Sequence, residues 1–453
     1  MRELLVITES IIKKNILLLQ KVRTKSTFTQ NVASTFLVQV LSMFLTVATA
    51  AIIARLLGPE GNGMLALALL VPHMLGLFLS GGIGVANVYF AGSRRLDVPT
   101  LTANSIGFAI IVTILGAGIV SVLSVTGWLK ALLPGVPIWL FLLAMFGFPT
   151  GLLSGYFSSI LQGLQRIITV NIVNLTQSVL TLVLTILLVI GFRLSLLGAL
   201  LSFLGAGVIS LMLIGVFLRR EGGVFTPKWD LAVIRSTFFF GMKGHIGNMF
   251  QFFNYRLDMF LVNFFIGTAS VGIYTVSVAI AEVLWYLPNA VAFVIFPKAA
   301  ATKPEVMNTF TPRVFYITLG LTLLGGLGLA IMGKCLIQLI FSSVFIGAYV
   351  PLLVLLPGVV LLGSTKVLTN EIAGRGYPHY NSINAGLALI LTVILDLLLI
   401  PRYKAIGAAF ASSVAYSVIS ITAVVFYAIV SRVTTESIVY TDNKNPLFKS
   451  NEY

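Results

Sequence analysis

Charged residues are scarce in this sequence of 453 residues. Asp, Glu, Lys and Arg make up 9% of it, against about 25% in a soluble domain, whereas hydrophobic residues make up 58%. Only 14 residues are acidic and only three are histidines. The mean hydropathy of +1.03 matches this balance. Because helices satisfy their own backbone hydrogen bonds in lipid, the composition predicts an all-α polytopic membrane protein.

Missing residue patterns exclude several classes of function. Cys335 is the only cysteine, so no disulfide can form within the chain. The sequence has no cluster of metal ligands, no phosphate-binding glycine loop and no nucleophile beside a histidine, so we expect no catalytic residue and no metal site. The net charge of +15 does not indicate nucleic-acid binding, because the basic residues are scattered through short loops, where membrane topology explains them.

Twelve apolar stretches are long enough for a membrane helix, which needs about 20 residues. Their expected bounds are 28–54, 63–90, 103–126, 137–161, 168–190, 195–218, 237–265, 270–296, 313–333, 344–365, 381–400 and 405–431. Basic and apolar residues of 1–27 recur at near-helical spacing, which predicts an interfacial helix. Residues 219–236 are expected to form a polar linker, and 432–453 a polar tail.

The distribution of Lys and Arg orients these spans. If the N-terminus is cytoplasmic, 20 of the 29 basic residues fall in inside segments and 6 in outside loops. This excess predicts an even number of spans with both termini in the cytoplasm. We expect no cleavable signal before the first span and a multi-pass protein of the cytoplasmic (inner) membrane.

An internal repeat relates the two halves. At a constant offset of 209 residues, six residues at span ends or turns match an identical residue: Gly58 with Gly267, Gly63 with Gly272, Arg166 with Arg375, Arg193 with Arg402, Gly198 with Gly407 and Ala199 with Ala408. Six spans separate the copies, so both halves enter the membrane in the same direction. The pattern predicts two parallel six-helix bundles, 28–218 and 237–431, related by a pseudo-two-fold axis along the membrane normal, with a cavity between them.

The seventh and eighth spans contain the residues that are most costly to place in lipid. They are Lys243, His245, Arg256, Asp258 and Glu282. Each ionised group at the bilayer centre costs about 2.5 to 3.5 kcal/mol, so this concentration indicates a polar cavity rather than a wall facing lipid. The repeat offset aligns His73 with Glu282, which places an ionisable residue at equivalent depth in each half.

Helical geometry sorts the seventh span into two faces. At about 100° per residue, one face carries His245, Phe252, Arg256 and Asn263, and the nearly opposite face carries Gln251, Asn254 and Asp258. Arg256 is the expected ligand of an anionic substrate, because a guanidinium stays charged when desolvated and matches phosphate geometry. Two interpretations of Asp258 stay open: a structural contact with a neighbouring helix, or direct ion coupling.

Four other ionisable residues have simpler interpretations. Lys243 and Lys366 lie near span ends, where long side chains snorkel toward the interface. His73 follows Pro72 and is expected to be a packed or hydrogen-bonded histidine more readily than a proton relay. Asp396 lies close to the expected outer boundary, where solvation explains it.

Several motifs resemble one family of transporters. They are residues 54–63 (ARLLGPEGNG), 81–84 (GGIG), 271–274 (VGIY) and 400–403 (IPRY). These runs resemble the polysaccharide flippases of bacteria and archaea, of the O-antigen type, within the multidrug/oligosaccharidyl-lipid/polysaccharide exporter superfamily. The resemblance covers residues 28–431.

The resemblance implies export of a polyprenyl-diphosphate-linked oligosaccharide to the outer leaflet by alternating access, for cell-surface polysaccharide biosynthesis. Arg256, with Lys243 and Lys366, would hold the diphosphate, and Asn248, Gln251 and Asn254 would contact sugars. No cofactor is implied beyond coupling to protons or sodium, for which the candidates are Asp258, Glu282 and His73. Expected partners are the lipid-linked substrate, membrane lipids, and a polysaccharide polymerase with its export machinery.

Other functions of this architecture remain open. A proton- or sodium-coupled multidrug antiporter of the same superfamily also has twelve spans, but a cationic drug would need Asp258 and Glu282 to dominate the cavity. Peptidoglycan-precursor flippases usually have fourteen spans, which disfavours them. A membrane glycosyltransferase or polymerase needs acids or a base at a surface site, and the outside loops are short and nearly free of acids.

Overall fold

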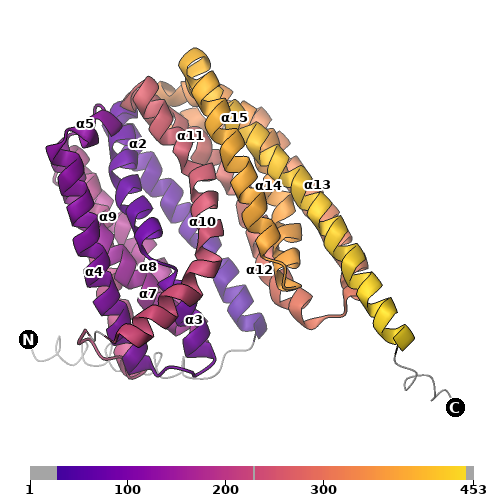
Figure 1. The fold of residues 1–453 in the computed structure, drawn as a ribbon. Helices are drawn as coiled ribbons and strands as arrows, with labels where there is room; N and C mark the ends of the chain where they lie inside the picture. The colour runs from indigo at the N-terminus through magenta and orange to yellow at the C-terminus, as the bar shows by residue number, and fades with distance from the viewer. Residues whose placement is uncertain (1–27, 228–229, 445–453) are drawn as a thin grey trace, which may run out of the picture.

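Long helices form nearly all of the structure. The computed structural model describes residues 28–227 and 230–444, and these residues form helices, turns and short connections without a strand (Figure 1). Nine helices within these ranges are long and apolar enough to cross a membrane. The chain is therefore a multi-pass membrane protein. The predicted interfacial helix of 1–27 lies outside the described residues.

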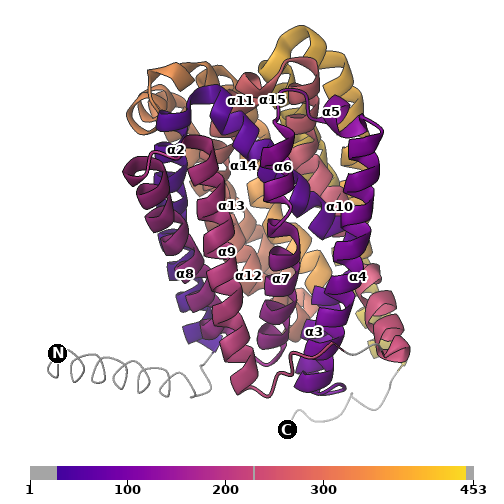
Figure 2. The same cartoon turned by 90° about the vertical axis from the view of Figure 1, so that its left-hand side faces the viewer.

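The first group of helices runs to Arg220. Its members are α2 (Phe28–Leu79), α3 (Ile83–Gly92), α4 (Val98–Val125), α5 (Trp128–Leu132), α6 (Ile138–Ala144), α7 (Gly147–Gly163), α8 (Ile167–Thr185), the π-helical η1 (Ile186–Gly191) and α9 (Ser195–Arg220). Within this N-terminal group, α7 packs against α3, α4 and α9, and α8 packs against α2 and α9. Figure 2 shows α8, α9, α7 and α4 in this order across one face.

The second group begins at Leu231. Its members are α10 (Leu231–Phe265), α11 (Thr268–Glu282), η2 (Val283–Trp285), α12 (Tyr286–Ala301), α13 (Pro304–Leu336), η3 (Ile337–Phe341), η4 (Ser343–Ala348), α14 (Tyr349–Gly374) and α15 (His379–Lys444). Helix α14 packs against α11, α12, α13 and α15, so it lies at the centre of this C-terminal group.

Two of the long helices are broken near the middle. Gly58 interrupts α2 at φ 68° and ψ −177°, and Lys404 interrupts α15 at φ 55° and ψ −137°. A straight helix of the 66 residues of α15 would be about 100 Å long, far beyond the roughly 30 Å of a bilayer core. The chain changes direction at both residues, which lie between consecutive predicted apolar stretches.

Glycines of the predicted repeat meet at the boundary between the groups. Gly58 and Gly267 both have extended backbone with positive φ, at 68° and 113°, just before an equivalent helix. A Cβ on Gly63 would overlap the carbonyl of Thr268, and a Cβ on Gly272 would overlap the carbonyl of Pro59, which is the repeat partner of Thr268. This reciprocity is the contact pattern that a two-fold axis produces.

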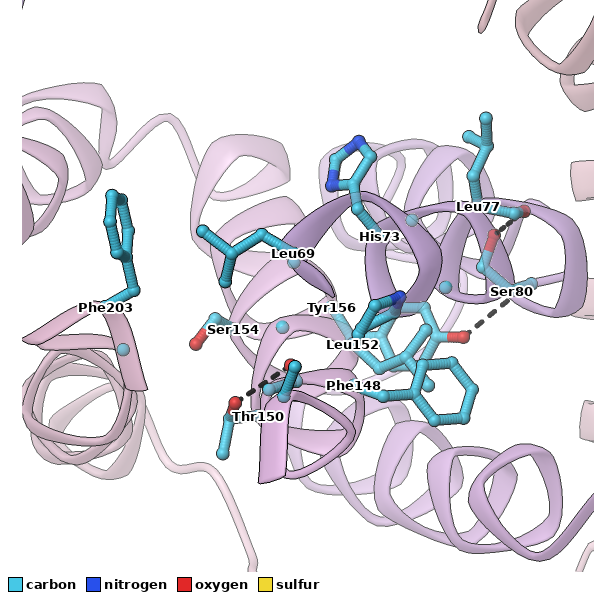
Figure 3. A pocket seen from close by; sticks show the side chains of 18 of the residues that line it. Leu69, His73, Leu77, Ser80, Phe148, Thr150, Leu152, Ser154, Tyr156 and Phe203 are labelled. Carbon is cyan, nitrogen blue, oxygen red and sulfur yellow. Dashed lines mark hydrogen bonds between the residues drawn. The ribbon is translucent and has the colours of Figure 1, made fainter. Parts of the chain in front are cut away.

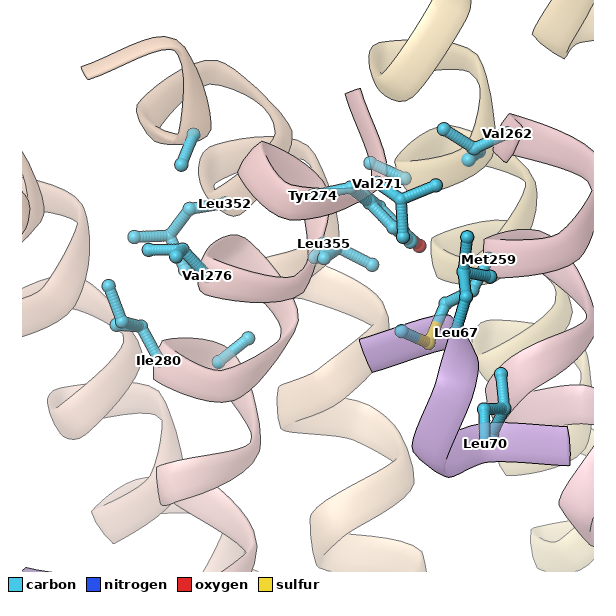
Figure 4. Close-up of a cluster of buried hydrophobic side chains, with 14 of the residues drawn as sticks. Leu67, Leu70, Met259, Val262, Val271, Tyr274, Val276, Ile280, Leu352 and Leu355 are labelled. Carbon is cyan, nitrogen blue, oxygen red and sulfur yellow. The ribbon is translucent and has the colours of Figure 1, made fainter. Parts of the chain in front are cut away.

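A buried apolar cluster joins the two groups near these glycines. Figure 4 shows Leu67 and Leu70 of α2 beside Met259 and Val262 of α10, with residues of α11 and α14 next to them. Asn62 of α2 also donates to the carbonyl of Gly272 at 3.1 Å. The groups are therefore packed together here through both apolar and polar contacts.

Helix α10 connects the groups over its whole length. Its first turns pack on α3, where Gly241 lies directly against Gly82, and its later turns pack on α15 (Figure 1). Near its start, Asn104 of α4 donates to the hydroxyl of Thr237 at 3.3 Å. The helix that carries most of the predicted site residues therefore lies between the two groups.

Candidate functional site

An ion pair occupies the centre of the predicted site. The guanidinium of Arg256 on α10 donates to both carboxylate oxygens of Glu282 at the end of α11, at 2.8 and 3.1 Å. The two side chains are 29% and 25% exposed. This bidentate geometry is also the geometry in which a guanidinium binds phosphate. In this conformation Glu282 already takes the place that an anionic ligand would need.

Lys366 of α14 brings a second cation to this region. Its Nζ lies 2.9 Å from Oδ1 of Asn289 and 4.1 Å from the ring centroid of Trp285. The ammonium group is within electrostatic range of the Glu282 carboxylate. The side chain is therefore directed at neighbouring helices, whereas snorkelling would direct it past the end of its own helix. Arg256, Glu282 and Lys366 together carry a net charge of +1.

His73 of α2 faces the ion pair from the other group. Its ring centroid is 5.5 Å from that of Phe252, and its ring is within electrostatic range of Arg256. The residues that the structure describes give this ring packing but no hydrogen bond. Figure 3 shows His73 on the wall of a cavity of about 570 Å³ between α2 and α7. The two ionisable residues aligned by the repeat, His73 and Glu282, therefore both approach Arg256.

Apart from Arg256, which pairs with Glu282 of α11, the polar residues on the two predicted faces of the seventh span contact different helix groups. On one face, Nε2 of His245 lies 2.6 Å from the carbonyl oxygen of Leu77, and Asn263 donates to the carbonyl of Pro134 at 3.1 Å. Both partners belong to the N-terminal group. On the other face, Asn254 donates to the carbonyl of Ala385 at 2.8 Å within the C-terminal group.

Asp258 is fully engaged in hydrogen bonds within the C-terminal group. Its carboxylate accepts from the backbone N–H of Met259 at 2.7 Å, from the hydroxyl of Tyr274 at 2.5 Å and from the hydroxyl of Ser412 at 3.2 Å. The side chain is 2% exposed. These bonds tie α10 to α11 and α15, as the structural interpretation of Asp258 requires. An ion-coupling role of the same carboxylate stays a prediction.

Asp396 does not lie where the sequence predicted. It is 0% exposed on α15, so the expectation that solvent accommodates its carboxylate is wrong. Neither carboxylate oxygen has a hydrogen-bond partner among the described residues, and the group is within electrostatic range of Asp258. The sequence position near a span end did not reveal that neighbouring helices cover this side chain. A buried carboxyl without partners is stable only when it is protonated or paired with a cation.

The amides expected to contact sugars are separated by the fold. Asn248 is exposed, Gln251 is half-buried, and Asn254 is buried with its oxygen accepting from Thr392 at 3.3 Å. Asn254 therefore makes structural contacts in this conformation. Lys243 lies on α10, but its side chain is outside the described part of the chain.

The sequence reasoning missed a second cavity, of about 520 Å³. Apart from Gln177, its polar lining residues on α2 and α8 recur every three or four positions, and they are Thr35, Gln39, Ser42, Thr46, Thr49, Asn171, Asn174, Ser178 and Thr181. This spacing places each set on one helix face. The spacing of these uncharged residues could therefore have predicted the cavity, although such residues cost less in a membrane span than charged ones and so mark a site less strongly.

Comparison with known proteins identifies related sequences and folds. The model of the family described as "Polysaccharide biosynthesis protein" matches residues 28–303. Two curated proteins of Haloferax volcanii are similar. The "Probable flippase AglR" is 27% identical over 232 residues, which is 48% of this chain and 47% of that protein. The "Probable low-salt glycan biosynthesis flippase Agl15" is 24% identical over 44% of this chain and 45% of that protein. The chain thus matches about half the length of these relatives.

Solved structures show the same fold at low sequence identity. The lipid II flippase MurJ in an inward closed conformation superposes with a TM-score of 0.73 at 17% identity, over 92% of this chain and 93% of that one. An inward-facing multidrug resistance MATE family transporter of the MOP superfamily superposes with a TM-score of 0.66 at 15% identity, over 87% of this chain and 96% of that one. At such identities the likeness concerns the fold alone.

Proposed function

The chain belongs to the polysaccharide biosynthesis protein family, and from that premise we propose that it is a flippase for a polyprenyl-diphosphate-linked oligosaccharide. The observation that supports this substrate class most directly is the cluster of Arg256 and Lys366 around Glu282 at the boundary between the helix groups. A net positive site suits a diphosphate, because a guanidinium binds phosphate through two parallel hydrogen bonds. The protein acts as a transporter and performs no chemical step on the substrate.

The proposed transport cycle uses two bundles of six spans, 28–218 and 237–431, joined by the linker 219–236. Counting α2 and α15 as two spans each and adding α10 to the long apolar helices gives twelve. The reciprocal contact of Gly63 and Gly272 supports a pseudo-two-fold axis between the bundles. Rocking about this contact opens the cavity first to one side of the membrane and then to the other.

Substrate binding exchanges one anion for another. In the empty site Glu282 neutralises Arg256, which lowers the cost of holding the guanidinium inside the protein. An arriving diphosphate replaces Glu282 as the bidentate acceptor of the Arg256 guanidinium, and Lys366 supplies a second positive charge. Displacement of Glu282 then separates α10 from α11, which links occupancy of the site to the movement of these helices.

A proton or a sodium ion drives the cycle through the C-terminal group. The buried pair of Asp258 and Asp396 supports this coupling, because Asp396 has both oxygens free of hydrogen bonds within the described residues. Two buried carboxyl groups within electrostatic range of each other favour binding of a cation or a proton. The same observation favours the second candidate function, a cation-coupled multidrug antiporter.

The protein operates in the cytoplasmic membrane with both termini inside the cell. It supplies lipid-linked oligosaccharide to a polymerase and to export machinery for cell-surface polysaccharide. The excess of basic residues in the predicted inside segments supports this orientation. Fusion of a reporter that works only in the cytoplasm to either terminus tests the orientation directly.

Transport in proteoliposomes tests the function. The protein is reconstituted with a polyprenyl-diphosphate oligosaccharide, and the glycan exposed on the outer surface is followed by enzymatic cleavage. Wild type and Arg402→Ala, which removes a guanidinium from an exposed position, are expected to move the lipid at equal rates. Arg256→Ala is expected to lose about a hundredfold in rate, as removal of one partner of a desolvated charge pair implies.

Two results contradict the proposal. Wild-type transport by Arg256→Ala shows that the guanidinium does not hold the substrate. Failure of wild type to move the lipid, together with export of a cationic dye under a proton or sodium gradient, replaces the flippase with the antiporter and assigns the site to carboxylates.

A further inference from the structure

The cavity between α2 and α8 has a lining that differs from the rest of the site. Two polar faces meet across it, with Gln39 and Ser42 on α2 and Asn174 and Ser178 on α8. The residues that line it include no Asp, Glu, Lys, Arg or His. Amides and hydroxyls both donate and accept hydrogen bonds, so this surface is suited to a ligand that is rich in hydroxyl groups and uncharged. A volume of about 520 Å³ lies in the range of small-molecule sites.

Much of this polar lining is available to a ligand. Among the described residues, the side-chain amides of Gln39, Asn174 and Gln177 form no hydrogen bond. The hydroxyl of Ser42 is buried without a partner. Asn171 differs, because it donates to the hydroxyl of Thr35 at 2.9 Å. Asn171 also donates to the hydroxyl of Ser34 at 3.3 Å, so it joins α2 to α8 through two hydrogen bonds. The side-chain amides of Gln39, Asn174 and Gln177 take no part in these bonds.

The cavity is placed to receive what is attached to the diphosphate. Tyr286, which lines it from the C-terminal group, follows Glu282 by one helical turn and is within electrostatic range of that carboxylate. Gln177 and Phe203 line both this cavity and the one beside His73, so the two cavities adjoin; Figure 3 shows Phe203 at the edge of the latter. The aromatic rings of Tyr286 and Phe203 offer flat apolar surface to the carbon face of a sugar ring.

We propose that the cavity between α2 and α8 is the glycan-recognition site and that it selects uncharged sugars, with Gln39, Asn174 and Gln177 as its principal hydrogen-bonding residues. The proposal rests on the flippase function proposed above and adds its substrate class. An acidic sugar such as a uronic acid is rejected, because its carboxylate would be desolvated without a cation to pair with it. The diphosphate is held by the C-terminal group and the sugars by the N-terminal group.

Binding to the full chain in lipid nanodiscs tests this proposal independently of transport. Three probes share a short prenyl diphosphate: one carries a neutral hexose oligosaccharide, one the same oligosaccharide ending in a uronic acid, and one no sugar. Wild type is expected to bind the neutral probe about tenfold more tightly than the other two, as two additional hydrogen bonds imply.

Matched variants locate the site. In the double variant Gln177→Ala, Asn174→Ala, the affinity for the neutral probe is expected to fall to that for the sugarless probe. The affinity for the sugarless probe is expected to stay unchanged. Thr176→Ala, on the same helix but outside both cavity linings, is expected to leave all three affinities unchanged. Gln177→Lys is expected to reverse the preference toward the uronic acid probe, because it adds a cation to the pocket.

Equal affinity of wild type for the three probes overturns the proposal. Equal weakening of all probes by the double variant does so too, since it indicates a structural role. If the probes bind as expected but proteoliposomes transport none of them, the glycan site stands and the proposed flippase function fails.

Discussion

The two helix groups repeat the same turns but differ in the chemistry of their interiors. The N-terminal group presents neutral groups such as the amides of Asn174 and Gln177 to the cavity between α2 and α8, whereas the C-terminal group contains Arg256, Asp258 and Asp396 within its helices. A duplicated scaffold needs only the shared turns. In the functions proposed above, this difference divides two tasks between the copies: the N-terminal group recognises sugars, and the C-terminal group binds the diphosphate and the coupling ion.

The two-fold relation between the helix groups is tested at Gly63 and Gly272, where the two groups contact each other. Ala at Gly63 or at Gly272 places a Cβ inside a carbonyl group of the opposite copy, so each variant is expected to lose about 3 kcal/mol of unfolding free energy or more. Because the contacts are reciprocal, the two losses are expected to be equal. Thermal unfolding followed by size-exclusion chromatography measures them.

Gly118→Ala serves as the control for this pair, since a Cβ there meets no atom within 4 Å. It is expected to retain wild-type stability. A large loss from only one of the two repeat glycines would break the symmetric interpretation of this contact.

The carboxyl groups of the C-terminal group are expected to differ from each other. Asp258→Asn disturbs hydrogen bonds with Tyr274 and Ser412 and is expected to cost about 1 to 3 kcal/mol of stability. Asp396→Asn removes no hydrogen bond and relieves the desolvation of a carboxylate, so its stability is expected to equal or exceed that of wild type. Thermal unfolding of both variants measures the difference.

Transport separates the same two variants. Asp396→Asn is expected to move substrate at a rate that no longer responds to a proton or sodium gradient. An unchanged response to both gradients removes Asp396 from the coupling site, even if its stability behaves as expected.

Removing the negative charge of Glu282 is expected to have a smaller effect, on ligand affinity. Glu282→Gln leaves the guanidinium of Arg256 without its competing carboxylate, so the affinity for a sugarless prenyl diphosphate is expected to rise about tenfold. Isothermal titration in nanodiscs measures it, with Glu305→Gln, at an exposed helix start, as the control. A weaker affinity in Glu282→Gln would mean that Glu282 orients Arg256 for the substrate.

Much of the site could be predicted along single helices. The placement of His245 and Asn254 on opposite faces of α10, the turns at Gly58 and Gly267, and the family followed from spacing and motifs, and all are confirmed. Asp396 was wrongly placed in solvent, because its distance from a span end says nothing about which helices cover it. The cavity between α2 and α8 was missed although its spacing was readable.

Hydropathy and glycine placement in the sequence determined a helical membrane protein that turns at defined points, because lipid admits few other backbone forms and positive φ favours glycine. The tertiary structure alone decided the partners of the ionisable groups. Arg256 binds Glu282, 26 residues further along the chain, and Asp258 binds Ser412, 154 residues away. These pairings depend on which side chains meet when helices pack, and the spacing of residues along a single helix does not contain that information.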